Sequence, residues 1–586
     1  MIEVKDIQKF RKVIDKVYQS DKYQKLRKDM DRYLKYFQGE FWKVGEKGHK
    51  ETDSEIFCNY IFSTIMTIAP LITDNRPIWY LRPRQFFLQK LFNIYAEVLE
   101  YAWDKLDCEM KLFKTIVISM IMKVGIWKIF FDPDGDDARI DIVDPRSFVI
   151  APGFDDPWEA PWCGTKTRRS LAWVLDRYPD SKNDLKREDA DGNLQEQEID
   201  WDKYDDAEGS NEFLTVYEMF IRDKTAEMIV DETAEEGKKK KKKSKYPNGR
   251  FTIFTKSATL EDKPSIYRHG RAPFVPFYDY LNPFEFFGMG EPDQIETLNL
   301  EFNFALKKMS NYVRRWCGLD VALDAGSGLD PDTFKQEAPG GENAWSIATG
   351  SEPPTPIIWP TINRTILDFM SAIPRLIQEV SGVQDVAKGM VTKKERQSAS
   401  EIATLIESSY TRTRQRVRNV EWSIKRALWL VTDIMQQFYT EPRSYNRNVD
   451  GTIEHGMIGN STAYVGQLLK PKEYSPAEKA GMEPPEEQEI QTQEQDYKKF
   501  LEAFGKVDEV YADFDLEVQT NSTLPMDRQS LANLMLRLFE LKGVDAEALL
   551  EILRIPKGKE IVQRMTQQQQ AEQTPPQPPQ MPIGGQ

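Results

Sequence analysis

The chain has 586 residues, with 79 Lys and Arg against 94 Asp and Glu, so its formal net charge is −15. Hydrophobic residues make up 40% of it and aromatic residues 11%, which is enough for a sizeable core and excludes a wholly disordered protein. The acidic balance argues against a protein that grips nucleic acid over a broad surface, because such binding needs many contacts between basic side chains and phosphates.

Cysteine and histidine are too sparse for a local metal or catalytic motif. The four cysteines stand singly, which excludes a disulfide scaffold and a Cys-x-x-Cys zinc site and suits a reducing compartment. No two of the three histidines have the spacing of a His-x-x-x-His metal site, although a triad assembled through space stays open. These residues are Cys58, Cys108, Cys163, Cys317, His49, His269 and His455.

The sequence also predicts no membrane span. Its most apolar run, Ile61 to Ile72, is interrupted by Ser, Thr and Pro and is shorter than the roughly 20 residues that cross a bilayer. The first 16 residues alternate charged and apolar side chains, unlike a secretory signal. We therefore expect a protein that is cytosolic where it is made.

The N-terminal part of the chain is predicted to be helical. Residues 1–40 form the first helical stretch and residues 53–73 the second, which Asn75-Arg-Pro77 terminates. A third helical run should follow Pro83 and cover residues 84–122.

The hydrophobic period then changes from helix to strand. Ile126–Phe131 and Ala138–Val143 are predicted to pair as a hairpin whose turn is Asp132–Asp137. The spacing of the acidic residues in this turn is similar to a calcium loop, but the glycine is misplaced and no Glu stands at the twelfth position. The pattern therefore favours a plain acidic turn.

Six lysines in a row, Lys238 to Lys243, lie between predicted strands at 213–222 and 250–256. They could contact nucleic acid or an acidic partner. We favour a solvated loop at the tip of a hairpin, because like charges repel and stay in water.

Two predicted rods follow, separated by a stretch rich in Gly and Pro at 319–360. The first begins beside Pro292 and ends at Gly318, with a length of about 38 Å at 1.5 Å per residue. The second contains Pro374, which should kink or interrupt it. Apolar residues recur at intervals of three and four on both: Ile295, Leu298, Phe302, Ala305, Met309, Tyr312 and Trp316 on the first, and Ile362, Ile366, Phe369, Ile373, Ile377 and Val380 on the second.

A basic polar loop at 387–397 precedes the longest predicted helix. Ser398-Ala-Ser-Glu401 is a capping box that starts this helix, and Pro442 marks its end about 40 residues later. A strand is expected at 512–519 and short helices at 527–542 and 545–554. The Gln- and Pro-rich tail that follows should be disordered.

The sequence carries no motif that indicates an enzyme. No Gly-Lys pair is followed by Ser or Thr, as a phosphate-binding loop requires, and there is no Gly-x-Ser-x-Gly elbow. We therefore expect no enzymatic activity and no cofactor.

Several short segments, in their order, are similar to the portal protein of tailed double-stranded DNA bacteriophages, the head–tail connector, of the short-tailed type. The resemblance covers roughly residues 30–560, and its specific part is the order helix, excursion, helix, basic loop, long helix. The segments are Tyr36–Trp42, Asn75–Pro77 with Arg82-Pro83, Asp144–Phe148 with Asp155, Gly288–Gly290 and Phe514–Pro525.

The resemblance implies a mixed α+β, predominantly helical fold with wing, stem, clip and crown regions. It assigns the chain as follows: 1–290 N-terminal wing, 291–318 first stem helix, 319–360 clip, 361–386 second stem helix, 387–397 tunnel loop, 398–525 C-terminal wing with the long helix, 526–562 crown, and 563–586 tail.

It also implies a function. Twelve copies would form a ring at one capsid vertex, through which a separate terminase packages DNA that is later ejected. The large terminase subunit, the major capsid and scaffolding proteins and the tail adaptors would be partners. The protein would lie in the virion, and in the host cytoplasm during assembly.

Basic side chains at the constriction would contact passing DNA transiently at its phosphates, without reading bases. The tunnel-loop candidates are Lys388, Lys393, Lys394 and Arg396. The channel-lining candidates on the rods are Lys307, Lys308, Arg314, Arg315, Arg364 and Arg375. Ion pairing or plain exposure to solvent is the alternative for each of them.

Two other classes of protein stay open. A non-enzymatic cytosolic helical scaffold or interaction protein would share the long helices, and a nucleic-acid enzyme could build its site from dispersed carboxylates. The number of copies in the assembled particle separates the first class from a portal ring, and metal-dependent nuclease or ATPase assays separate the second.

Overall fold

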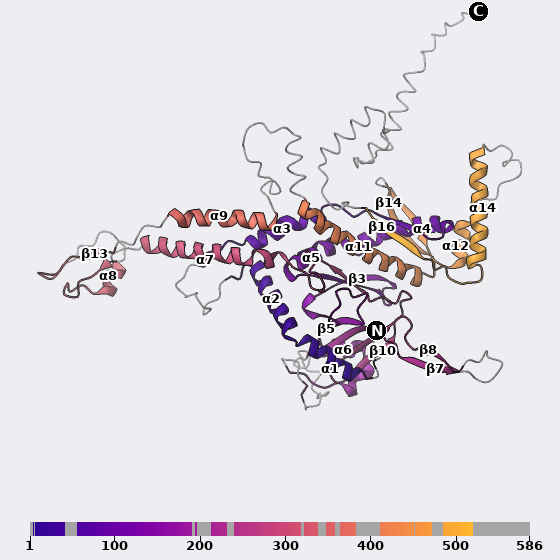
Figure 1. Cartoon of the computed structure of the whole chain (residues 1–586), viewed down its shortest axis with the longest axis horizontal. Helices are drawn as coiled ribbons and strands as arrows, with labels where there is room; N and C mark the ends of the chain where they lie inside the picture. The colour runs from indigo at the N-terminus through magenta and orange to yellow at the C-terminus, as the bar shows by residue number, and fades with distance from the viewer. Residues whose placement is uncertain are drawn as a thin grey trace, which may run out of the picture.

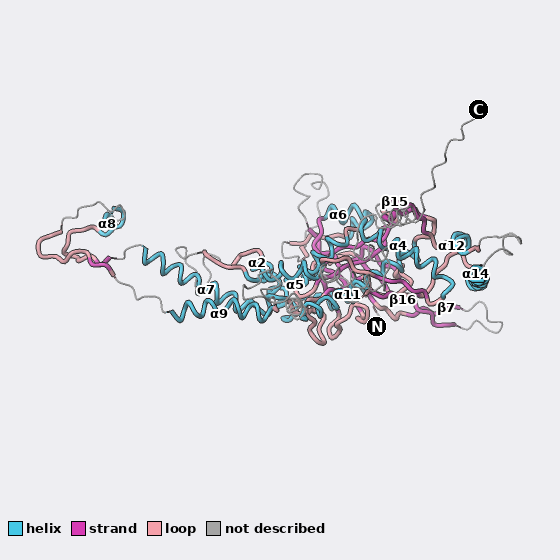
Figure 2. Tube along the Cα trace, turned by 90° about the horizontal axis from the view of Figure 1, so that it is seen from above, coloured by secondary structure: helices cyan, strands magenta, loops and turns pink. Residues whose placement is uncertain are grey.

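The computed structural model describes residues 4, 6–41, 55–189, 194–195, 213–230, 240–317, 321–337, 347–357, 364–382, 411–449, 452–471 and 484–519. A mixed α/β body carries a pair of helices that projects from one side in both views (Figures 1 and 2). The predicted fold class, mixed and predominantly helical, is confirmed.

The N-terminal helical stretch consists of two helices, α1 (Ile7–Tyr18) and α2 (Asp21–Phe37), and not of one. The break is at Ser20, whose backbone is extended with φ −60° and ψ 148°. Asp6 begins α1 by accepting hydrogen bonds from the backbone N–H groups of Gln8 and Lys9.

The next helices are also more divided than the sequence suggested. Helix α3 (Tyr60–Thr73) begins seven residues later than predicted and is capped by Asn59. The run predicted over 84–122 is split into α4 (Gln89–Lys105) and α5 (Cys108–Met122), because Asp107 adopts a left-handed conformation with φ 50°.

The predicted acidic hairpin is confirmed as β2 (Gly125–Asp132) and β3 (Asp137–Val143), and β11 (Phe274–Phe277) adds a third strand beside β2. Within the turn, Asp132 accepts a hydrogen bond of 3.3 Å from the backbone N–H of Asp134 and pairs with Arg139. The acidic turn is therefore held by its own polar contacts.

A five-stranded sheet forms the lower part of the body in the order β10-β9-β6-β5-β4, next to helix α6 (Leu171–Arg177). The strands predicted at 213–222 and 250–256 are confirmed as β6 and β9. The prediction of a loop is wrong for Lys240–Lys243, which belong to strand β8. The bounds are β4 Phe148–Ile150, β5 Trp162–Ser170, β6 Phe213–Ile221, β7 Ala226–Val230, β8 Lys240–Ser244, β9 Arg250–Phe254 and β10 Thr259–Pro264.

The predicted rods are confirmed as helices α7 (Glu291–Cys317) and α9 (Arg364–Ser381). Pro374 does not interrupt α9, which is continuous through it. Between the rods lie α8 (Pro331–Glu337) and the paired short strands β12 (Val321–Ala322) and β13 (Thr355–Pro356). The described part of the long helix is α11 (Thr411–Phe438); its predicted capping box lies outside the described residues.

The C-terminal part contains elements that the sequence did not predict. A hairpin, β14 (Arg443–Val449) and β15 (Thr452–Ile458), leads to α12 (Thr462–Leu469) and to α14 (Pro484–Phe504). The strand predicted at 512–519 is confirmed as β16 (Phe514–Val518), which pairs with the unpredicted β1 (Trp79–Pro83). The predicted helices at 527–554 and the Gln/Pro tail lie outside the described residues. Short 3₁₀ helices occur at Phe86–Leu88, Pro145–Ser147 and Pro179–Asp184.

One large apolar core runs through α3, α4, α5, α11 and the three-stranded sheet. The side chains of Trp127, Phe92 and Phe277 in it are fully buried. Because α7 and α9 join this core only through a few residues near the base of the pair, such as Ile295, Ile373 and Ile377, the rest of the pair extends away from the body.

Candidate functional site: the projecting helix pair and its base

The helices α7 and α9 lie side by side along the projection (Figures 1 and 2). The most buried side of α7 is polar, because Asn299, Asn303 and Lys307 follow Ile295 at four-residue intervals and are at most 2% exposed. The apolar stripe found in the sequence is only partly buried from its second position on. Its described members there are Leu298, Phe302, Ala305, Met309 and Tyr312.

The polar side of α7 holds the segment that leads into α3. The Asn303 Oδ1 atom accepts a hydrogen bond of 2.7 Å from the backbone N–H of Cys58, and Asn299 Oδ1 accepts one of 3.0 Å from that of Tyr60. Backbone donors that are buried need such partners, so the two amides tie α7 to the body along its first four turns.

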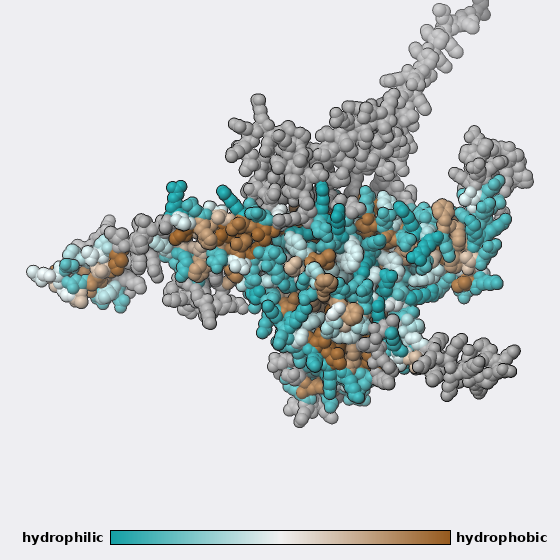
Figure 3. Space-filling view, in the orientation of Figure 1, coloured by the Kyte–Doolittle hydropathy of each residue, from teal (hydrophilic) through white to brown (hydrophobic). Residues whose placement is uncertain are grey.

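Helix α9 buries one edge and exposes a broad apolar face. Ile373 and Ile377 are each 2% exposed and belong to the large apolar core. The adjoining apolar side chains are between 38% and 52% exposed, and Figure 3 shows hydrophobic colour gathered along the helix pair. These side chains are Ile366, Phe369, Leu376 and Val380. An apolar face of this extent on a soluble protein is typical of a surface that another molecule covers.

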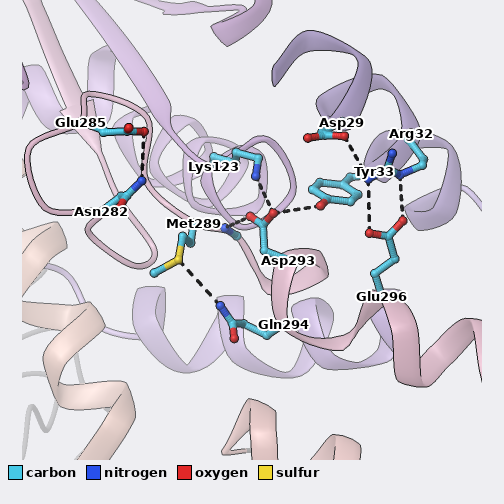
Figure 4. Close-up of polar contacts among 11 residues, drawn as sticks. Asp29, Arg32, Tyr33, Lys123, Asn282, Glu285, Met289, Asp293, Gln294 and Glu296 are labelled. Carbon is cyan, nitrogen blue, oxygen red and sulfur yellow. Dashed lines mark hydrogen bonds and ion pairs between the residues drawn. The ribbon is translucent and has the colours of Figure 1, made fainter. Parts of the chain in front are cut away.

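The N-terminus of α7 is fixed by Asp293 (Figure 4). Its carboxylate accepts hydrogen bonds from the Tyr33 hydroxyl at 2.9 Å, from the Lys123 ammonium and from the backbone N–H of Gly290 at 2.9 Å. Burial and then the negative charge of Asp293 raise the pKa of Tyr33 strongly, so this phenol stays a donor. A carboxylate in the first turn also interacts favourably with the helix dipole.

A buried ionic joint lies next to this anchor. The Arg416 side chain on α11 is 2% exposed; its guanidinium pairs with Glu291 at the start of α7, and its Nε atom lies 3.3 Å from the Asp279 carboxylate. Arg416 also donates to the Tyr280 hydroxyl and, at 3.4 Å, to the carbonyl of Ser381, where α9 ends. Burial raises the pKa of Asp279 to about 7.

This joint brings together the beginning of α7, the end of α9 and the first described turns of the long helix. The last two of these elements, α9 and the long helix, flank the basic loop in the sequence. A second contact reinforces the joint, because Ser423 on α11 donates a hydrogen bond of 2.6 Å to the carbonyl of Pro276. Sequence reasoning missed the joint, since single charged residues far apart in the chain give no local pattern.

The structure distributes the predicted basic residues unevenly. Lys388, Lys393, Lys394 and Arg396 lie outside the described residues, and so does the side chain of Arg315. Lys308, Arg314, Arg364 and Arg375 are exposed on the helix pair, with the Lys308 Nζ atom 5.3 Å from the centre of the Phe304 ring. The prediction of Lys307 as a channel-lining residue is corrected. Its side chain is buried within the protomer and does not face solvent, because it continues the Asn299–Asn303 side of α7.

The described residues contain neither a metal-binding cluster nor a membrane-spanning helix. No group of three or more His, Cys, Asp or Glu side chains there is arranged to hold a metal ion. None of the helices in that part of the chain combines the length and the hydropathy of a bilayer span.

The comparisons with known proteins give one informative match. The model of the phage P22-like portal protein family matches residues 17–584. No curated protein is similar enough in sequence to count as a relative. Among solved structures, a chain of the "Virion of native gene transfer agent (GTA) particle" has a TM-score of 0.35 and 9% identity, with 69% of this chain and 81% of that chain covered. A likeness of that size supports no conclusion by itself.

Proposed function

This chain belongs to the phage P22-like portal protein family, and on that premise we propose that its copies close into a ring that double-stranded DNA passes through. DNA would enter the capsid through this ring during packaging, driven by a separate terminase, and would leave through it at ejection. The single protomer would contribute one wall segment of the channel.

The observation that carries the proposal is the projecting pair α7–α9 with its uncovered apolar face. The described residues of the protomer leave Phe369, Leu376 and Val380 exposed on one side of α9. Packing such faces between neighbouring copies buries them, at roughly 25 cal/mol per Å² of apolar area. In the proposed contact, each copy presents different surfaces to its two neighbours. Repeating this heterologous contact gives a ring when the rotation between copies closes.

We propose that the regions keep the roles that the resemblance assigned to them. The helices α7 and α9 are then the stem, residues 319–360 the clip that faces the motor and later the tail adaptors, and residues 387–397 the tunnel loop. The surrounding α/β body is the wing, and residues 526–562 are the crown.

The basic side chains would act as weak, reversible phosphate contacts. Four exposed residues of the pair, Lys308, Arg314, Arg364 and Arg375, are the channel-lining candidates, together with Arg315. The tunnel-loop candidates are Lys388, Lys393, Lys394 and Arg396. The proposed role requires no cofactor and no chemical step, so the protein would act as a conduit and a docking platform and not as an enzyme.

The proposed partners follow from the position at a capsid vertex. They are other copies of this chain, most simply twelve, the large terminase subunit, the major capsid and scaffolding proteins, and the tail adaptors. The chain would then lie in the host cytoplasm during assembly and in the virion afterwards.

The decisive experiment is the oligomeric state of purified protein. We expect mass photometry to show closed particles of about twelve copies without added nucleotide. A substitution on the uncovered face, Phe369→Asp, should shift the population to protomers, because it places a charge in an apolar contact.

The matched control is Ser371→Asp, an exposed position on the opposite side of the same helix, which should leave the particles intact. Only protomers over a wide concentration range would contradict the ring and favour the scaffold alternative. Particles that tolerate Phe369→Asp would show that α9 is not the contact.

A further inference from the structure

A column of alternating tryptophan and arginine side chains lies beside α11, which carries Trp422, Arg426 and Trp429. The Arg426 guanidinium lies 4.0 Å from the ring centre of Trp422 and 4.3 Å from that of Trp158. The Arg271 guanidinium lies 4.4 Å from Trp158 and 4.4 Å from Trp429. The order of the column is therefore Trp422, Arg426, Trp158, Arg271 and Trp429. Each guanidinium lies between two indole rings.

The two arginines differ in their polar partners. Arg426 forms two hydrogen bonds, of 2.8 and 2.6 Å, to the carboxylate of Asp156. Among the residues that the structure describes, the Arg271 side chain has neither a hydrogen bond nor an ion pair; only its backbone N–H is engaged, with the ring of His269. The indole N–H of Trp158, in the same column, is also buried without a partner in that part of the chain.

Charges of both signs surround Arg271, but none of the acidic groups that the structure describes bonds to its guanidinium. Burial and then the positive charge of Arg426 lower the pKa of Arg271, and Arg222 acts in the same direction. The carboxylates of Asp433 and Asp156 act in the opposite direction, although Asp156 is bonded to Arg426 and Asp433 to the Tyr511 hydroxyl and neither bonds to Arg271. An arginine in this position keeps its donors available to a ligand that has two acceptor oxygens.

The surroundings favour a carboxylate from a protein over a phosphate of DNA. Arg271 is only partly exposed between the rings, so a side chain can reach it more readily than the backbone of a stiff duplex. The outer end of the column, Trp422, is 42% exposed, and tryptophan and arginine are the residue types that dominate protein contacts. A second copy of this chain carries a net charge of −15, so it offers more carboxylates than cations.

We propose that the edge of Arg271 binds a carboxylate side chain of the neighbouring copy, with Trp422 packed beside it. This inference rests on the proposed ring, because the ring is what places a second copy against the body. It adds a contact in the body to the apolar contact of α9. A second contact, in the body, would fix the angle between neighbouring copies.

The first experiment measures the reactivity of Arg271 toward phenylglyoxal by peptide mass spectrometry. In the protomer that Phe369→Asp releases, Arg271 should react; in the assembled ring, the reaction should be about tenfold slower or more, the effect expected of one charge-assisted bond. The control is Arg268, which already pairs with Glu509 at 2.8 Å and should react alike in both states. Equal reactivity of Arg271 in ring and protomer would overturn the proposal.

The second experiment separates the site from the ring. Glutarate and inorganic phosphate are added to the protomer at matched ionic strength, and protection of Arg271 is followed. Protection by glutarate supports a carboxylate site. Protection by phosphate alone would overturn the carboxylate assignment and indicate nucleic acid. If glutarate protects Arg271 in a protein that never forms rings, the carboxylate site is retained. The carboxylate would then not come from a second copy, and the proposed function would be wrong.

A variant pair tests the contribution to assembly. Arg271→Lys keeps the charge but loses the planar fork, so the ring should dissociate at higher concentration than the unmodified ring does. Arg268→Lys is the matched control and should not change the dissociation. Near-ultraviolet circular dichroism of the tryptophans shows whether Arg271→Lys keeps its fold. A folded Arg271→Lys protein that assembles as well as the unmodified one would count against the proposal.

Discussion

Arg416 connects three elements through one buried side chain. It faces the carboxylates of Asp279 and Glu291, and its own side chain is 2% exposed. Buried ion pairs add little net stability when they replace apolar packing, but breaking one leaves an uncompensated charge in the interior. Removing the Arg416 side chain would therefore destabilise the fold chiefly by leaving buried carboxylates without this cation.

We predict that Arg416→Ala lowers the free energy of unfolding by about 3–5 kcal/mol, because two buried carboxylates lose the cation that they share. Urea denaturation followed by circular dichroism measures the loss. Arg418→Ala, exposed two residues away on the same helix, should change stability by less than about 0.5 kcal/mol. Similar losses for both variants would show that the joint has no special role.

The same joint predicts a dependence of stability on pH. Burial raises the pKa of Asp279 in the folded protein to about 7, above its usual value of 3.8. The folded state therefore binds the proton more tightly, and the stability that this proton contributes is complete below about pH 4 and is lost as the pH rises through 7. Glu291, Arg416 and the Tyr280 hydroxyl face the same carboxyl and stay in place in the test.

Asp279→Asn removes this titration, because an amide does not ionise. We expect the stability of the variant relative to the unmodified protein to improve between pH 5 and pH 8, as measured by urea denaturation at both values. A difference between the two proteins that is independent of pH would show that Asp279 does not titrate in this window.

At the scale of the elements, the basic loop can be tested through the assembled particle. We predict that Lys393→Ala with Lys394→Ala leaves the ring intact but impairs packaging or retention of DNA, because transient phosphate contacts at the constriction are lost. Ring formation is checked by mass photometry and packaging by the length of DNA protected in particles. Packaging of full-length DNA at the unmodified level would remove the loop from the mechanism.

The elements were predictable where a local period dominates. The intervals of three and four in α7 and α9, and the alternation in β2–β3 and β16, indicate the right structure type from sequence alone. The strand β1 and the hairpin β14–β15 were missed, because short strands are stabilised by pairing partners that local sequence does not show. Helix ends such as the break at Ser20 depend on single capping residues and were placed less well.

The candidate site was predictable in place but not in detail. The sequence indicated two rods and a basic loop, yet its apolar spacing did not indicate that the most buried side of α7 is polar. Asn299 and Asn303 are buried because the segment before α3 needs acceptors for its backbone, which is a tertiary requirement. The burial of Lys307 follows from the same geometry, and no local sequence signal distinguishes Lys307 from the exposed Lys308.

At the scale of the whole molecule, net charge constrains how a ring could handle DNA. Each chain carries −15, so twelve copies would carry twelve times that, −180. A field of this sign repels a polyanion, and strong adhesion would hinder a duplex that has to move in both directions. The exposed basic residues of the helix pair would then form only a few short-lived contacts with DNA phosphates, while the net charge of the ring repels the duplex.

We therefore predict that assembled rings bind short duplex DNA weakly and without preference for sequence. The logarithm of the binding constant should fall with the logarithm of salt concentration, with a slope of about −0.9 for each phosphate contacted at one time. Fluorescence anisotropy with labelled duplexes of different sequence measures both properties. Replacing Arg364 and Arg375 with Gln should make the slope shallower, whereas the exposed Thr297→Gln should leave it unchanged. Tight or sequence-selective binding would mean that the protein holds DNA in place, which is incompatible with a channel through which the duplex slides.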